Sequence, residues 1–94
     1  NEIEKMFFDT FGIEAKTIIE PHYSLNTEYY EEKVEKYPQI TDHILLELII
    51  ILGSICTVFD KNVDDLKENI LKNLIELSGR YHIYNQVRTL FEEG

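Results

Sequence analysis

Cysteine, glycine, proline and tryptophan are all scarce in this chain of 94 residues, which holds one cysteine, four glycines, two prolines and no tryptophan. The single cysteine, Cys56, excludes an internal disulfide and a zinc site built from several thiolates. One free thiol is typical of a reducing compartment, so we expect the protein in the cytoplasm. The glycines, at positions 12, 53, 79 and 94, are too scattered for a phosphate-binding loop, and nucleotide binding is not expected.

Positive charge is also scarce: the chain has 9 Lys and Arg residues and 18 Asp and Glu residues, so its formal net charge is -9. A chain this acidic repels phosphate backbones, so we expect no direct binding to nucleic acid. The acids are concentrated toward one end. Residues 1–47 hold eleven acids against four bases, a net of -7, whereas residues 48–94 hold seven against five, a net of -2.

The longest apolar segment is too short for a bilayer. It runs from Ile44 to Phe59, about 16 residues where a spanning helix needs about 20, and Glu47 interrupts it. The chain opens on acidic and polar residues, unlike a secretory signal. We therefore expect neither a membrane span nor an export signal.

The remaining composition, 44% hydrophobic and 29% charged, is that of one globular domain over residues 1–94. Apolar residues at helical spacing predict a short helix over residues 2–11, with Gly12 as its C-terminal cap. A stronger helix is expected over residues 42–59, capped by Thr41 or Asp42. Its apolar residues surround the helix on all sides, so we predict that it is the buried central helix.

Two further helices are expected toward the C-terminus. The first begins near a capping Asn62, and the second follows Ser78 and Gly79. The predicted core stripe of the first helix is Val63, Leu66, Ile70, Leu74 and Leu77, and that of the second is Tyr84, Val87, Leu90 and Phe91.

Residues 13–37 allow two interpretations. A small β-hairpin could pair residues 16–20 with part of 28–36, because Thr17, Ile18 and Ile19 are β-branched. A helix from Glu28 to Lys36, capped by Thr27, competes with it. The predicted fold class is therefore mainly α: a compact single-domain bundle of four to five helices, with or without a small β-hairpin near residues 16–36.

No catalytic, cofactor-binding or metal-binding residues are expected, and we predict that the protein is not an enzyme. Its three histidines, His22, His43 and His82, lie in separate segments. His43 and Glu47 share a helix face, but a metal site needs three or four ligands and no companion motif exists. Cys56 within an apolar helix is expected to be a poor nucleophile.

The segment of residues 28–35 interleaves tyrosines with carboxylates, which favours a docking face for a protein partner with a basic surface. The predicted partner-binding residues are Glu28, Tyr29, Tyr30, Glu31, Glu32 and Glu35. The alternative is an ordinary solvated face whose tyrosines fold back on the core.

Three stretches stand out together: Phe7 to Glu14, Tyr37 to Asp42 running into Ile44 to Ile49, and Val87 to Glu93. In this order they resemble small proteins of prophages in Gram-positive bacteria. The resemblance rests on core and capping residues, so it carries over no functional residue. It implies a phage context, in which small acidic proteins often inhibit host enzymes or defence nucleases.

The sharpest functional hypothesis is accordingly an anti-CRISPR-like inhibitor that blocks the basic nucleic-acid channel of a host defence protein. The alternative is a structural or regulatory helical homodimer. Its contact surface would be the excess apolar face of the central helix around Ile44, Ile51 and Val58.

Overall fold

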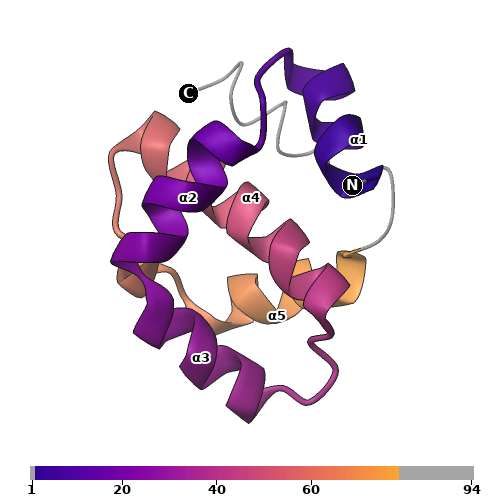
Figure 1. Cartoon of the computed structure of the whole chain (residues 1–94). Helices are drawn as coiled ribbons and strands as arrows, with labels where there is room; N and C mark the ends of the chain where they lie inside the picture. Colours follow the sequence, from indigo (N-terminus) through magenta and orange to yellow (C-terminus); the bar gives the residue numbers. More distant parts are fainter. Residues whose placement is uncertain (1, 79–94) are drawn as a thin grey trace.

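The computed structural model describes residues 2–78, and within this range the chain forms helices and loops without any strand (Figure 1). The elements are α1 (Glu2–Phe11), α2 (Lys16–Leu25), α3 (Thr27–Lys36), α4 (Asp42–Phe59), the 3₁₀ turn η1 (Val63–Asp65) and α5 (Glu68–Leu77). The predicted mainly-α bundle is therefore confirmed. The predicted last helix, around Tyr84 to Phe91, lies outside the described residues.

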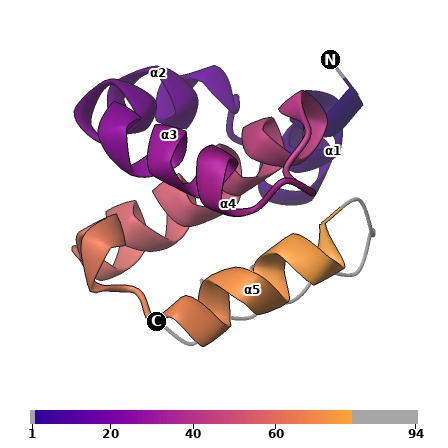
Figure 2. The ribbon, with the colours of Figure 1, turned by 90° about the horizontal axis from the view of Figure 1, so that it is seen from below.

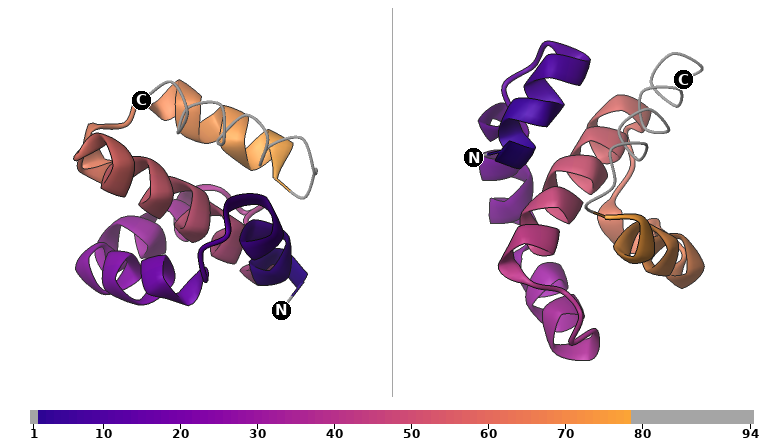
Figure 3. Two further views of the ribbon diagram at one scale, coloured as in Figure 1. Left: turned by 90° about the horizontal axis from the view of Figure 1, so that it is seen from above. Right: turned by 90° about the vertical axis from the view of Figure 1, so that its right-hand side faces the viewer.

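The central position of α4 organises the bundle. Helices α1, α2 and α3 lie on one side of it and α5 lies on the other (Figures 2 and 3). This arrangement follows from the sequence of α4, because a helix that is apolar on all sides needs cover on more than one side. Leu48, Ile50, Ile51 and Leu52 are all buried.

The predicted bounds of α1 and α4 are confirmed. Helix α1 ends before Gly12, which has a positive φ of 72° and donates its N–H to the carbonyl of Phe8. Helix α4 starts after Thr41, whose Oγ1 accepts a hydrogen bond from the backbone N–H of Ile44 at 3.3 Å. It ends at Asp60, which adopts the left-handed conformation with φ 52°.

By length and composition α4 could cross a membrane, since it has 18 residues and a mean hydropathy of 2.0. Half of these residues are buried inside the protein, however, and among them is the carboxylate of Glu47, which is 1% exposed. The core helix of a soluble protein has the same length and composition. This feature alone therefore does not place the chain in a bilayer.

The β-hairpin considered for residues 16–36 is wrong, because both halves of that segment are helical. The β-branched Ile18 and Ile19 pack on the core from α2, and this burial outweighs their local preference for a strand. Pro21 lies inside α2, where its ring has no N–H to donate. Thr27 does not cap α3 as expected: its Oγ1 donates to the carbonyl of Tyr23 at 2.8 Å and so ties α3 back to α2.

The helix expected from Asn62 onward is divided in two. Asn62 caps only η1, by accepting the N–H of Asp64 at 3.2 Å, and α5 then begins at Glu68. The break changes the side of the helix that faces the core. Leu71 and Ile75 are buried instead of Ile70, which is 41% exposed. The predicted core stripe is therefore wrong at Ile70.

Helices α2 and α4 approach each other most closely at Gly53. A Cβ atom placed there would lie 2.6 Å from Cγ2 of Ile18 and 3.1 Å from Cγ of His22. Only a residue without a side chain allows the two helices to pack at this separation. Gly53 thus sets the position of α2 on the central helix.

Candidate protein-docking face

The four predicted glutamates of α3 lie on one side of the helix. Glu28 and Glu31, like Glu32 and Glu35, are three positions apart, the pairs Glu28–Glu32 and Glu31–Glu35 are four apart, and all four side chains are exposed. Residues at this spacing are neighbours on a helix surface. The acidic part of the predicted docking face therefore exists as a continuous stripe, which we call the α3 acidic stripe.

Tyr30 does not belong to this surface, because only 1% of it is exposed and it packs in the core. Its hydroxyl lies 2.8 Å from Nε2 of His22, and Asn26 Nδ2 lies 3.4 Å from the other ring nitrogen. Burial raises the pKa of Tyr30 and lowers the pKa of His22. The anchoring role expected for Tyr30 does not fit this burial, and here the alternative of a tyrosine folded back on the core holds.

Tyr29 is half-buried and lies at the edge of the stripe. Its ring meets that of Tyr30 edge-on, with centroids 5.4 Å apart, and the ammonium of Lys33 lies 5.1 Å from its centroid. Desolvation by burial raises the pKa of Tyr29 to about 12. The ring is therefore uncharged, packed against Tyr30 and only partly exposed.

Glu68, the first residue of α5, binds both lysines of α3, and one of them also contacts the stripe. Lys36 donates to its Oε1 at 2.9 Å, and Tyr37 donates to the same oxygen at 2.6 Å. Lys33 lies 3.4 Å from it and also 3.9 Å from Glu32. The hydrogen bonds from Tyr37 and Lys36 lower the pKa of Glu68 to about 2. Sequence analysis missed this cluster, because its members lie more than thirty positions apart in the chain.

Replacement of Glu68 by glutamine is expected to make the thermal stability of the protein fall less steeply as the pH is lowered. The pKa of Glu68 is below its unfolded value of 4.5, so its stabilisation is complete above that pH and is lost as pH falls toward 2. Thermal melts of both proteins between these limits measure the difference. Glu76→Gln, which removes an exposed carboxylate of the same helix, should leave this pH dependence unchanged, and an equal effect there would contradict the assignment.

Beside the stripe lies a hollow of about 450 Å³, which we call the acidic hollow. It is open between the α2–α3 turn and η1. Three carboxylates line it: Glu28 and Glu32 from α3, and Asp64 from η1. Asp64 was not among the predicted site residues, because only the folded chain brings η1 next to α3. The lining also includes Leu25 and Tyr29.

On the other side of Leu25 an apolar groove of about 370 Å³ runs between α2 and α4. Its main apolar walls are Ile13, Ile18, Pro21, Leu25 and Val58. Leu25 is 84% exposed, and Ile13 and Val58 are each more than 40% exposed. No sequence pattern indicates this groove, because isolated apolar residues at helix ends are indistinguishable from core residues.

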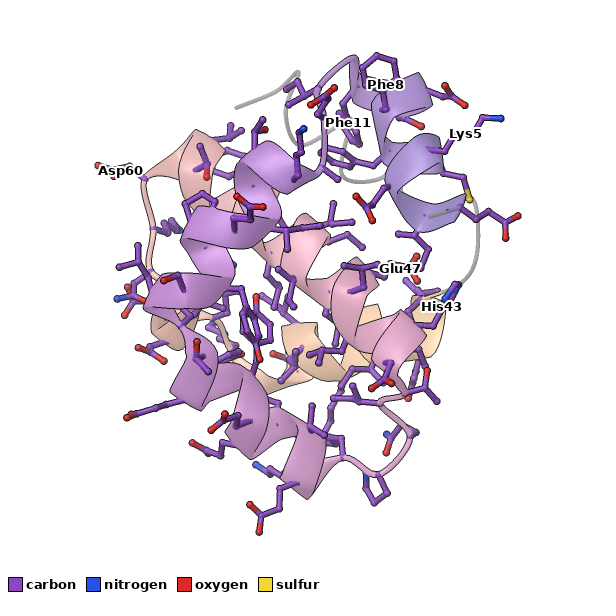
Figure 4. The ribbon with its side chains drawn as sticks, in the orientation of Figure 1. Lys5, Phe8, Phe11, His43, Glu47 and Asp60 are labelled. Carbon is purple, nitrogen blue, oxygen red and sulfur yellow. The ribbon has the colours of Figure 1, made fainter. Side chains whose placement is uncertain are left out.

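The histidines and the cysteine of the described residues are His22 in α2, and His43 and Cys56 toward opposite ends of α4. Within residues 2–78 no three His, Cys, Asp or Glu side chains are grouped so that they could hold a metal ion. His43 is exposed near the start of α4, whereas Glu47 is buried one turn later (Figure 4). Burial raises the pKa of the Cys56 thiol, which disfavours the reactive thiolate.

No family model, curated protein or solved structure matches this chain. The resemblance to prophage proteins consequently stays a prediction. What the molecule does has to be argued from the α3 acidic stripe, the acidic hollow and the apolar groove.

Proposed function

We propose that this protein is a non-enzymatic binding module that docks on a basic surface of a partner protein through the α3 acidic stripe. The observation that carries the proposal is the separation of charge around α3. Glu28, Glu31, Glu32 and Glu35 are exposed along one side, while Lys36 and Lys33 contact Glu68 of α5. Lys33 also lies 3.9 Å from Glu32, but its side chain is only 12% exposed, so the field that this side of the helix presents to a partner is mainly negative.

The sharper form of the proposal is an anti-CRISPR-like inhibitor that occupies the basic nucleic-acid channel of a host defence nuclease in the cytoplasm. Glu28 and Glu35 are seven positions apart, which corresponds to about 10 Å along the helix axis. A channel whose positive charge attracts successive phosphates also attracts such a row of carboxylates. The net charge of -9 further favours encounter with a basic partner.

The homodimer is the second candidate, and the burial of its expected contact residues weakens it. Ile51 is fully buried and Ile44 is half-buried, so of the three residues only Val58, at 44%, is substantially exposed. Helices α1, α2 and α5 already cover α4 on several sides. The excess apolar surface on which the dimer hypothesis depended is therefore smaller than expected.

Reversal of Glu31, Glu32 and Glu35 to lysine is expected to slow association with the partner by at least about tenfold and to abolish inhibition. Exposed charges act mainly on the encounter rate, so the difference should shrink as added salt shortens the screening length below about 8 Å. The partner is first captured from host lysate, and its association rate is then measured by surface plasmon resonance.

A matched control carries the same change in net charge elsewhere. Asp9, Glu20 and Glu76 are exposed on α1, α2 and α5, and their reversal should slow association far less. Tyr29→Ala should instead speed dissociation, because an aromatic contact is lost only after docking. Equal effects of the two triple variants would show that total charge, and not the stripe, governs binding.

A further inference from the structure

Leu25 is the most exposed large apolar residue described and lies where separate hollows meet. It lines both the apolar groove and the acidic hollow, and also a third depression beside Asp60 and Lys61. A leucine 84% exposed at the end of α2 loses the benefit of burial. A partner that covers it would recover that benefit.

The apolar groove has firm walls. Gly53 lets α2 pack tightly against α4, with Ile18 and His22 at the closest approach, and both of these residues line the groove. The opposite rim is Val58 of α4. Since both walls belong to helices packed on the core, the groove exists before any partner binds.

The two neighbouring hollows differ in chemistry. One side of Leu25 is apolar, whereas the other carries the carboxylates of Glu28, Glu32 and Asp64. An occupant that fits both must present an apolar side and a positively charged side next to each other. A helix with leucine-like residues on one face and Lys or Arg on the other has this property.

We propose that the apolar groove and the acidic hollow together bind one basic amphipathic helix of the partner protein, with Leu25 at the boundary between them. Apolar side chains of that helix enter the groove between α2 and α4, and its cations face Glu28, Glu32 and Asp64. The proposal rests on the proposed function and specifies the segment of the partner that is recognised.

Charge complementarity selects a basic partner over a second copy of this chain. In a twofold dimer the same patch meets itself, so the acidic hollows of two chains of net charge -9 would lie close together. Like charges brought together at an interface oppose association. A basic helix turns the same carboxylates into favourable contacts.

The test uses two fluorescent peptides and the full chain. The first is a synthetic leucine and lysine peptide of about four helical turns with all its leucines on one face. The second has the same composition in scrambled order, so it keeps the charge but has no apolar face. Fluorescence anisotropy at physiological salt gives the Kd of each peptide.

The amphipathic peptide is expected to bind at least about tenfold more tightly than the scrambled one. Leu25→Gln and Val58→Gln should each remove most of this preference. Phe8→Gln is the matched control, because Phe8 is 48% exposed and projects from α1 (Figure 4). Unchanged thermal melts of the three variants confirm that the fold is intact.

Four results would overturn the proposal. Equal binding of the two peptides, unaffected by Leu25→Gln, would mean that charge alone recognises the partner and would leave the α3 acidic stripe intact as a docking face. An equal loss in Phe8→Gln would place the apolar contact elsewhere. A concentration-dependent dimer that Leu25→Gln dissociates would make a second copy the occupant. Binding of neither peptide would count against the α3 acidic stripe as well.

Discussion

Leu48→Ala is expected to lower the free energy of unfolding by about 2 to 5 kcal/mol, because the substitution leaves a cavity that the surrounding helices cannot fill. Leu48 is 1% exposed and belongs to the buried cluster that joins α3, α4 and α5. Urea denaturation followed by circular dichroism measures the change in midpoint.

Leu25→Ala is the matched control, since it makes the same substitution in a helix at a position that is 84% exposed. We expect it to change stability by no more than about 0.5 kcal/mol. If the two variants unfolded at the same urea concentration, α4 would not be the central core helix.

Gly53→Leu is expected to lower the free energy of unfolding by about 3 kcal/mol, an effect similar to that of Leu48→Ala. A whole side chain must enter where even a Cβ atom would be 2.6 Å from Ile18. Separation of α2 from α4 would also distort the apolar groove, so the amphipathic peptide should lose its preference. Denaturant midpoints and the peptide Kd report the two effects separately.

The stability of Gly53→Ala distinguishes the effect of close packing from the effect of helix propensity, because the two predict changes of opposite sign. Propensity alone predicts a gain of about 1 kcal/mol, whereas the close approach to Ile18 predicts a loss. Ile18→Ala in the same chain makes room for the new methyl group, so the double variant should lose less than the sum of the two single losses. A more stable Gly53→Ala protein would show that α2 does not press against α4.

The sequence predicted the fold best where local signals and burial agree. Helix α1 has both an apolar stripe and a terminal Gly12, and α4 has a capping Thr41 and apolar residues on all sides. For α2 the local signals were misleading, because the β-branched residues and Pro21 disfavour a helix that packing on α4 stabilises. The hydrogen bonds that Lys36 and Tyr37 donate to Glu68 join residues more than thirty positions apart, so no local pattern could predict them.

The candidate site was only partly predictable for a similar reason. The α3 acidic stripe is visible in the sequence because its glutamates recur at helical spacing within one segment. The burial of Tyr30 depends on contacts with other helices, and Asp64 and Leu25 join the site only through the packing of α2, α3 and η1. A surface formed by separate segments leaves no periodic pattern in the chain.

The position of α4 in the chain has a consequence for biosynthesis. Translation proceeds from the N-terminus, so α1, α2 and α3 leave the ribosome before α4 does. Ile3, Phe7 and Tyr30 then have no central helix against which to pack, and their apolar surface is open to chaperones and proteases. These side chains can reach their buried positions only after residues 42–59 have emerged, because the residues of α4 complete both core clusters.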